Sequence, residues 1–470
     1  MLLFSHLRTG VSAGKSAVFC FHWTWKRFLH VGTRVTMSPV RVQVEPDSKC
    51  LFDRPVTVKV EGLSPHQPVA LRATLTGDKG DVFASVARYQ ADERGLIDLS
   101  QSASLGGDYT GVQPMGFLWA LKPLKPLRRL MKRDMATPFT VHITVHGQAA
   151  GSVESTTPPL ASCLHERSFL GEGVKRIPVR EGRIRGTVFL PRVSELMDRF
   201  SSGDGPFPGV IDLGGTAGGL LEHRGCLLAN HGFVTMVLAY FGFEDLPQNM
   251  DEFHLEYFEE ALHFFQALPQ VRENSIGVLG LSKGADLALS MASFLSGISA
   301  VVNVSGCYAN FQCQLHYKGT TLPALKCYPE KIKVDQASGL LNFSEAYDDP
   351  RDPGCQAVVP IERASARFLF VAGEDDKVWN ASLYASEAAK RLISHGKERP
   401  EVLIFPGTGH IIEPPYFPHC HSSFHKVINA PVLWGGQAES HAFAQEEAWR
   451  RIRQFFLDNL GAAGCRQSKL

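Results

Sequence analysis

The sequence predicts an α/β protein in which an antiparallel β-sandwich precedes a mostly parallel sheet with helices on both of its faces. Two patterns predict this fold class. Apolar and polar residues alternate between residues 37 and 160, and short apolar segments alternate with segments of helical spacing between residues 161 and 464. Alternation buries one face of a strand, which is typical of antiparallel sheets, whereas apolar strands separated by helices indicate a parallel sheet.

The sandwich prediction rests on short alternating segments separated by turns. The clearest of these segments are residues 56–60, 69–75 and 139–145. Turn residues, such as the Gly-Leu-Ser-Pro segment at residues 62–65, divide them at short intervals. This spacing favours a β-sandwich, and the Ser/Thr/Pro stretch at residues 155–159 sets its expected end at residue 160.

Three short apolar segments predict buried strands of the second domain: residues 209–213, 233–238 and 275–279. Between the last two, apolar residues recur at helical spacing from Leu255 to Phe265, which predicts a helix that crosses over the sheet. Strand, helix and strand in this order give parallel strands. Functional residues are therefore expected at the carboxyl ends of these strands, where such sheets bind their ligands.

Composition and charge exclude several function classes. The chain has 48 Lys and Arg residues against 47 Asp and Glu residues, and its formal net charge of +1 provides no global field for nucleic acid. No apolar run is long enough to span a bilayer. The ten cysteines form no Cys-x-x-Cys pair, and the cluster of His419, His421 and His425 has no accepted metal-ligand spacing. We therefore expect a monomer without cofactor, metal, nucleic acid partner or membrane span.

Residues 1–36 have the composition of a targeting extension. They contain five Lys or Arg residues and no acidic residue, among Ser, Phe, Leu and Trp. This composition is typical of a mitochondrial presequence. Met37 is a second potential start, so the extension is expected to belong to one isoform. The form that starts at Met1 is then expected in the mitochondrial matrix.

Residues 465–470 form an expected tail with a second address. Ser468, Lys469 and Leu470 match the peroxisomal tripeptide, which an import receptor recognises only at a free carboxyl terminus. The preceding residues 461–464 are all Gly or Ala, which favours access for a receptor. We therefore expect a peroxisomal protein, with the mitochondrial matrix as the alternative.

Residues 280–284 fit the pattern Gly-x-Ser-x-Gly, with Ser282 at its centre. This pattern lifts a serine above a strand end before a helix begins, and glycine is required because the backbone there packs without room for a Cβ. The pattern alone is weak, because residues 10–14 also match it. Context separates the two matches: Ser282 follows a predicted strand and precedes a predicted helix. Ser282 is therefore the candidate nucleophile.

A serine nucleophile needs a base, and the base needs an acid that orients it. In α/β-hydrolases the three follow in the order serine, acid, histidine. The predicted strand at residues 367–371 leads into a loop with Asp376, and the strand at residues 402–405 leads into a loop with His410. The neighbouring Asp375 is the alternative acid. Asp376 is preferred because a Gly-x-x-Asp loop at this place usually offers its fourth residue.

The oxyanion of a tetrahedral intermediate needs two preset N–H donors. One is expected from the backbone of Lys283, just after the nucleophile. The other is expected from Gly214 or Gly215, in the glycine-rich loop after the strand at residues 209–213. A dinucleotide-binding loop is disfavoured there, because Thr216 occupies the place of the second glycine.

Longer motifs carry a family resemblance. They are residues 111–116, 119–121, 254–261, 280–284, 291–295 and 410–416. In these segments the chain resembles the type I acyl-CoA thioesterases, a family that also contains the bile acid-CoA:amino acid N-acyltransferases. The resemblance runs from about residue 40 to residue 460. It implies an amino-terminal β-sandwich, a carboxyl-terminal α/β-hydrolase domain and long-chain acyl-CoA as the substrate class.

The family's triad falls on Ser282, Asp376 and His410, which favours Asp376 over its acidic neighbour. One departure from the family pattern lies in the glycine-rich loop. Gly214 and Ala217 stand there in place of residues expected to be bulkier and smaller, respectively. The departure concerns the oxyanion donors rather than the triad.

A dense basic run is a candidate for binding the phosphates of coenzyme A. It comprises Lys122, Lys125, Arg128, Arg129, Lys132 and Arg133, of which the first four are the preferred contacts. Cationic side chains bind phosphate oxygens through charge-assisted hydrogen bonds. A run of like charge is more often a solvated surface, so both interpretations stay open.

Serine at position 282 favours hydrolysis over acyl transfer. The acyltransferase branch of the family has cysteine at the elbow, and its thioester is open to attack by an amine. An acyl-serine is an oxyester, which leaves water as the natural second nucleophile. The alternatives are glycine or taurine conjugation, a non-catalytic acyl-CoA carrier, and an esterase of small esters.

Overall fold

The computed structural model describes residues 39–147, 158–192 and 206–461. The predicted targeting extension at residues 1–36 and the tripeptide Ser468, Lys469 and Leu470 therefore lie outside the described residues. Both addresses stay predictions. The β-sandwich and the parallel sheet belong to one compact unit that begins at Pro39.

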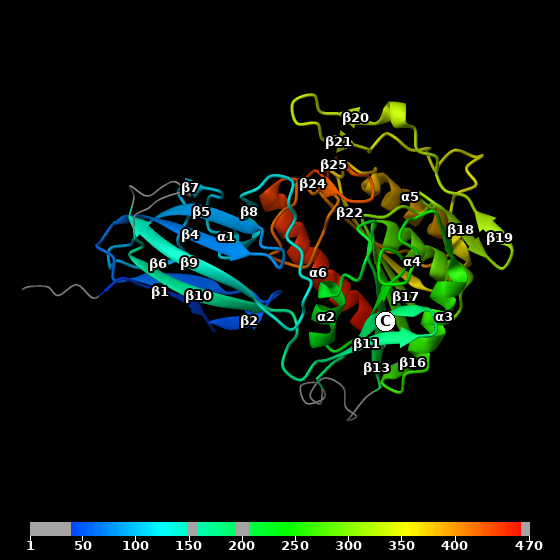
Figure 1. Ribbon diagram of the computed structural model, residues 1–470, viewed down its shortest axis with the longest axis horizontal. Helices are drawn as coiled ribbons and strands as arrows, with labels where there is room; N and C mark the ends of the chain where they lie inside the picture. The colour runs from blue at the N-terminus through cyan, green and yellow to red at the C-terminus, as the bar shows by residue number, and fades with distance from the viewer. Residues whose placement is uncertain (1–38, 148–157, 193–205, 462–470) are drawn as a thin grey trace, which may run out of the picture. The chain divides into compact units, whose positions relative to one another are not determined.

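The first part of the chain forms two sheets, drawn in blue and cyan in Figure 1. Their strands are β1 (Arg41–Glu45), β2 (Lys49–Leu51), β3 (Thr57–Glu61), β4 (Pro68–Thr76), β5 (Val82–Gln90), β6 (Ile97–Asp98), β7 (Gly106–Gly107), β8 (Lys122–Pro123), β9 (Phe139–Gly147) and β10 (Ala161–Ser168). The sheet orders are β1-β3-β6 and β2-β10-β9-β4-β5-β7, with β8 on β5. All pairs except the parallel β2–β10 pair are antiparallel. The predicted antiparallel sandwich is confirmed.

Strand β10 lies on the far side of the expected boundary at residue 160. It pairs antiparallel with β9, with Ala161 opposite Val145, so the first sheet extends to Ser168. The pairing of β9 with β10 therefore joins two strands of one sheet across the expected boundary, where the sequence predicts a connection between two domains. Turn residues mark both kinds of connection, and only the pairing partner distinguishes them.

The second part of the chain is built on an eight-stranded sheet. Its strands are β11 (Lys175–Glu181), β12 (Ile184–Leu190), β13 (Phe207–Leu213), β14 (Val234–Ala239), β16 (Val271–Leu281), β17 (Ala300–Val304), β22 (Arg367–Gly373) and β23 (Glu401–Phe405), in the order β11-β12-β14-β13-β16-β17-β22-β23. The β11–β12 and β12–β14 pairs are antiparallel, and the other pairs are parallel. The five strands predicted in this region fall on β13, β14, β16, β22 and β23, which confirms the mostly parallel sheet.

Helices cover both faces of this sheet (Figure 1). They are α2 (His223–Asn230), α3 (Leu255–Gln266), α4 (Lys283–Phe294), α5 (Ala381–Ser394) and α6 (Ala438–Leu460). The buried side chains of α2 and α6 pack in one apolar cluster together with the core of the sandwich. Those of α3, α4 and α5 pack in a second cluster on the opposite face. The helix predicted between residues 255 and 265 is α3.

Shorter elements complete the fold. They are α1 (Gly116–Trp119), β15 (Glu252–His254), β18 (Gln314–Tyr317), β19 (Thr320–Leu322), β20 (Lys333–Val334), β21 (Leu341–Asn342), β24 (Ser422–His425) and β25 (Ala430–Leu433), with single 3-10 turns at Pro329–Lys331 and Ile361–Arg363. Strands β24 and β25 form an antiparallel hairpin. Among the described residues, no helix combines the length and apolarity needed to cross a membrane.

Candidate active site

Ser282 lies on a strained turn between β16 and α4. Its backbone has φ 57° and ψ −123°, a conformation that non-glycine residues rarely adopt. A Cβ at Gly280 would lie 2.2 Å from the carbonyl oxygen of Gly284, and a Cβ at Gly284 would lie 2.4 Å from that of Leu213. Both flanking positions therefore require glycine, because a Cβ would collide with the backbone. The tight turn places the serine above the end of the sheet.

The three residues predicted to act together form a chain of two hydrogen bonds, with His410 in the middle. Ser282 Oγ lies 2.9 Å from His410 Nε2, and His410 Nδ1 lies 2.7 Å from Asp376 Oδ2. All three side chains are buried. They follow the carboxyl ends of β16, β22 and β23, which the parallel order brings to one edge. An aspartate that accepts the Nδ1 proton leaves Nε2 unprotonated and able to accept the serine proton.

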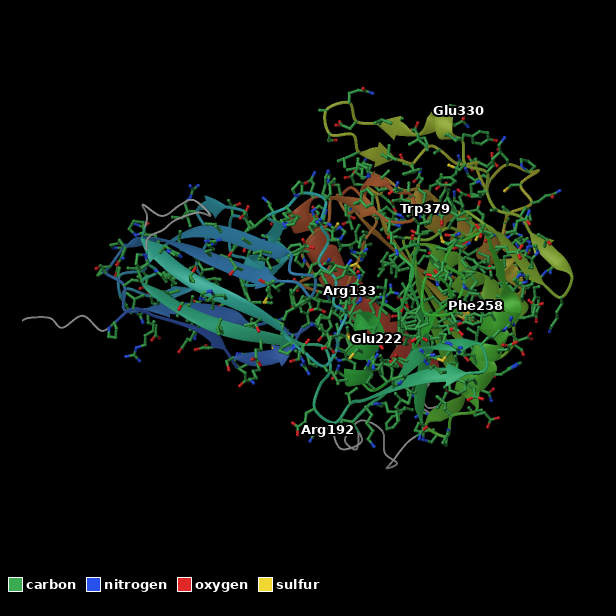
Figure 2. The ribbon with its side chains drawn as sticks, in the orientation of Figure 1. Arg133, Arg192, Glu222, Phe258, Glu330 and Trp379 are labelled. Atoms are coloured by element: carbon green, nitrogen blue, oxygen red, sulfur yellow. The ribbon has the colours of Figure 1, made fainter. Side chains whose placement is uncertain are left out.

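The carboxylate of Asp376 is held by backbone donors. Its Oδ1 accepts hydrogen bonds from the N–H of Val378 at 2.8 Å and of Trp379 at 3.2 Å. Trp379, labelled in Figure 2, also packs edge-on against the ring of His410, with 5.1 Å between the centroids. These contacts fix the orientation of the carboxylate and of the imidazole that it meets.

The alternative acid, Asp375, faces other partners. It accepts a hydrogen bond from the backbone N–H of Gly436 at 2.8 Å and forms an ion pair with Lys377 Nζ at 2.5 Å. The carboxylate next to His410 is that of Asp376. The structure therefore brings Asp376, and not Asp375, together with Ser282 and His410.

Two of the three predicted oxyanion residues present their backbone near Ser282. The N–H of Lys283 is the first of helix α4 and has no partner within the helix. A Cβ at Gly215 would lie 2.9 Å from Ser282 Cβ and 3.4 Å from its Oγ. Gly214 lies one residue back, where its carbonyl accepts the hydroxyl of Tyr240 at 2.6 Å. The geometry thus favours Gly215 over Gly214 as the loop's contribution.

The side chain of Lys283 points away from this site. Its ammonium group donates to Asp286 Oδ2 at 2.8 Å, Asn310 Oδ1 at 2.9 Å and Phe311 O at 2.6 Å, in a fully buried position. Burial raises the pKa of the Asp286 carboxyl, against the opposing effect of the Lys283 charge. A buried lysine with three acceptors anchors the start of α4, so only the backbone of this residue is available to a ligand.

A cavity of about 490 Å³ opens above Ser282 and His410. Its walls come from the glycine-rich loop, from a sandwich segment at residues 127–133, and from the β24–β25 hairpin. The sandwich therefore supplies part of the site rather than serving as a separate module.

The basic run divides between this cavity and other surroundings. Arg128, Arg129, Lys132 and Arg133 line the cavity, whereas Lys122 and Lys125 are not among its lining residues. The ammonium group of Lys122 pairs with Asp108 at 2.8 Å. Arg133 is labelled in Figure 2.

Of the four residues of the basic run that line the cavity, two form ion pairs in which both side chains are largely buried. Lys132 Nζ is buried 2.8 Å from Asp78 Oδ1. Arg129 pairs with Glu413, which His223 Nε2 also contacts at 2.7 Å. Burial alone would raise the pKa of Glu413, but the charges of His223 and Arg129 lower it well below its usual range. Arg128 is more exposed and lies 3.5 Å from Asp81. Sequence could not separate these environments, since the carboxylates come from distant segments.

The β24–β25 hairpin adds side chains that the sequence did not assign to the site. His425 Nε2 lies 2.8 Å from Thr216 Oγ1. The ring of Trp434 stacks on His410, with centroids 5.8 Å apart and an interplanar angle of 16°. The other two clustered histidines contact backbone carbonyls: His419 Nε2 lies 3.0 Å from Gly435 O, and His421 Nδ1 lies 3.2 Å from Gly436 O.

Comparison with known proteins identifies matching families over both parts of the chain. A family described as the acyl-CoA thioester hydrolase/BAAT N-terminal region matches residues 53–181. A family described as the BAAT/acyl-CoA thioester hydrolase C terminal matches residues 253–462.

Curated relatives align over most of their length. Human acyl-coenzyme A thioesterase 2, mitochondrial, is 46% identical over 422 residues, which cover 89% of this chain and 84% of that protein. The mouse peroxisomal succinyl-coenzyme A thioesterase is 45% identical over 429 residues, covering 91% and 98%. Among solved structures, an esterase of Pyrococcus furiosus shares 13% identity at a TM-score of 0.36, covering 61% of this chain and 93% of that one. The family matches and the curated relatives confirm the resemblance seen in the sequence, and the chain belongs to the BAAT/acyl-CoA thioester hydrolase family.

Proposed function

We propose that this protein hydrolyses acyl-CoA thioesters to a free acid and coenzyme A. Ser282 is the nucleophile, His410 the general base and Asp376 the residue that orients the base. The observation that carries the proposal is the hydrogen-bonded chain from Ser282 through His410 to Asp376, of which Ser282 and His410 line the cavity. Family membership supports the thioester as the bond that is cleaved.

Acylation follows from this geometry. His410 Nε2 takes the proton of Ser282 as Oγ forms a bond to the thioester carbon, and the carbonyl electron pair moves onto oxygen. The N–H groups of Lys283 and Gly215 stabilise this oxyanion. When the carbonyl re-forms, the carbon–sulfur bond breaks, and coenzyme A leaves as a thiolate that takes up the proton from His410. The product is an acyl-Ser282 oxyester.

Deacylation repeats the sequence with water. His410 takes a proton from water, whose oxygen attacks the acyl carbon, and it then returns a proton to Ser282 as the free acid departs. A thiolate is a better leaving group than an alkoxide, so acid catalysis by His410 matters more in this second half-reaction. An oxyester resists amines better than a thioester does, and this difference favours hydrolysis over glycine or taurine conjugation.

Long-chain acyl groups remain the proposed substrate class, and the structure defines what such a chain must displace. An aromatic recess beside Ser282 is lined by Phe343, Tyr347, Trp379 and Trp434, among others. Its open volume is about 10 Å³. A long acyl chain enters this recess only if its walls move. One of these walls is the β24–β25 hairpin, whose two strands are joined by a short turn.

Arg128 is the proposed phosphate contact that is most easily tested. Its side chain is half exposed at the cavity, and a solvated charge that meets a phosphate contributes binding rather than chemistry. We expect Arg128→Ala to raise KM for palmitoyl-CoA about five- to tenfold with kcat unchanged. Initial rates at varied substrate concentration measure both constants. Lys122→Ala, which removes a charge outside the cavity lining, is the matched control. An unchanged KM in Arg128→Ala excludes the contact.

The proposed function is tested by product analysis. Purified protein is given acyl-CoA substrates of several lengths, with and without glycine or taurine, and free thiol, free acid and amide are quantified. We expect thiol and free acid in equal amounts over many turnovers, and no amide. Amide as the main product favours the conjugating enzyme, and substrate bound stoichiometrically without thiol release favours a carrier. Faster cleavage of small esters than of thioesters favours an esterase.

Localisation is proposed from the two terminal addresses. An import receptor that recognises Ser468, Lys469 and Leu470 directs the protein to the peroxisome, and the form starting at Met1 is directed to the mitochondrial matrix. Relatives carry both locations in their names. Imaging of forms that start at Met1 and Met37, with an unblocked carboxyl terminus, distinguishes the two.

A further inference from the structure

Thr216 and His425 form a buried hydrogen-bonded pair beside the triad. Thr216 Oγ1 lies 2.8 Å from His425 Nε2, although the two residues are 209 positions apart in the chain. Both side chains are buried, and both line the cavity that contains Ser282 and His410. Thr216 directly follows Gly215, the loop residue whose backbone approaches the nucleophile.

The hydrogen bonds around His425 assign its proton. The backbone N–H of Ile428 donates to His425 Nδ1 at 3.2 Å, so Nδ1 is the acceptor nitrogen. Burial, together with the nearby Arg129 and His410, lowers the pKa of His425 to about 4, which leaves its ring neutral at neutral pH. A neutral ring with Nδ1 as acceptor carries its proton on Nε2. His425 therefore donates to Thr216 Oγ1.

The proton of Thr216 is then directed elsewhere. A hydroxyl has one proton, and its oxygen already accepts from His425. Among the described residues, His425 is the hydrogen-bond partner found for Oγ1, so the hydroxyl proton is available to a ligand in the cavity. Accepting a hydrogen bond also polarises the hydroxyl and strengthens it as a donor.

The β24–β25 hairpin and the following Trp434 fix the position of this pair relative to His410. Trp434 stacks on the ring of His410 and also lies against His425, with ring centroids 5.8 Å apart in each case. Its indole N–H donates to Ser423 Oγ at 2.8 Å. The backbone N–H of His410 donates to Trp434 O at 2.9 Å. The base of the triad and the partner of Thr216 are thus fixed by the same aromatic side chain.

We propose that the hydroxyl of Thr216, oriented by His425, is a third donor to the oxyanion, beside the backbone N–H groups of Lys283 and Gly215. This inference rests on the proposed acyl-CoA hydrolysis and adds a side-chain donor to it. Its role is greatest in the transition state, because the carbonyl oxygen gains negative charge only there. His425 is a positioning residue, since it acts through Thr216.

Substitution of Thr216 separates the hydroxyl from the shape of the side chain. Thr216→Val keeps the size and removes the hydroxyl, and we expect kcat to fall about 10²- to 10³-fold with little change in KM. Thr216→Ser keeps the hydroxyl and is expected to stay within about threefold of the original kcat. A Thr216→Val protein with undiminished kcat overturns the proposal, as does a Thr216→Ser protein that loses as much as the valine variant.

Binding of two inhibitors gives a readout that a packing defect would not produce. A trifluoromethyl ketone analogue of palmitoyl-CoA forms an oxyanion with Ser282, whereas the hexadecyl thioether of coenzyme A forms none. We expect Thr216→Val to weaken the ketone by the factor lost in kcat/KM and to leave the Kd of the thioether unchanged. Equal weakening of both inhibitors indicates a structural role and contradicts the inference.

Variants of His425 keep the test decisive if Thr216→Val does not fold. His425→Leu removes the N–H that orients the hydroxyl, and we expect about a tenfold loss of kcat that the ketone affinity reproduces. His421→Gln, in the same segment but outside the cavity lining, is the control. The activity of the unsubstituted protein distinguishes a failure of the proposed function from a failure of the inference about Thr216. Absence of thiol release from that protein refutes the proposed function, whereas normal turnover with unaffected His425→Leu and Thr216 variants refutes this inference alone.

Discussion

A Ser282→Ala protein is expected to lose about 10⁴- to 10⁶-fold of its kcat for palmitoyl-CoA. The methyl group of alanine cannot form the acyl intermediate. Among the described residues, the oxygen found at hydrogen-bond distance from His410 Nε2 is Ser282 Oγ. The remaining rate then comes from water held by the oxyanion donors. Release of free thiol under saturating substrate measures the loss.

The control for this variant is a serine of the same helix. Ser290 in α4 is also buried, and its hydroxyl donates to the backbone carbonyl of Asp286 at 2.9 Å, outside the cavity lining. We expect Ser290→Ala to retain kcat and Ser282→Ala to retain affinity for the hexadecyl thioether of coenzyme A. Undiminished hydrolysis by a correctly folded Ser282→Ala protein would show that the hydroxyl is not the nucleophile.

Local chemistry explains why the sequence predicts the fold and predicts that Ser282, Asp376 and His410 lie together. The strained turn needs glycine at positions 280 and 284, because a Cβ there would lie 2.4 Å or less from a backbone carbonyl oxygen. The two glycines are therefore visible in the sequence as a motif. Loops with Asp376 and His410 follow predicted strands, and the parallel order brings such strand ends to one edge. Each of these patterns, the glycine motif and the two strand–loop segments, spans only about ten residues of the chain.

The rest of the site depends on contacts that no local pattern encodes. In the sequence, Thr216 only interrupts the glycine pattern of a dinucleotide-binding loop, and His425 only belongs to a histidine cluster without metal-ligand spacing. Their pairing needs the β24–β25 hairpin to return over the sheet. Likewise, the buried environment of Lys132 depends on Asp78, which is 54 residues away. Sequence shows which charges are near each other in the chain, but not which become buried together.

The second large effect is expected for Asp376→Asn, which changes the proposed acid of the triad and should lower kcat. An asparagine amide at this position presents N–H groups to His410 Nδ1 or loses its bond to it, so the imidazole is no longer fixed with Nε2 free to accept the serine proton. We expect kcat to fall about 10³- to 10⁴-fold, with the affinity for the thioether analogue retained. Thiol release and inhibitor binding, measured on the same preparation, check both parts.

The matched control is the neighbouring Asp375, the alternative acid that the sequence offers. Asp375→Asn removes a charge that pairs with Lys377 and with the backbone of Gly436, and neither contact reaches His410. Its effect on kcat is expected to stay within about threefold, because the substitution affects a partly exposed ion pair and one backbone hydrogen bond, neither of which involves the triad. The two variants differ by one position in the chain and by the loss of the same charge. A larger loss of kcat in Asp375→Asn than in Asp376→Asn therefore means that the hydrogen bond to His410 Nδ1 does not orient the base during turnover.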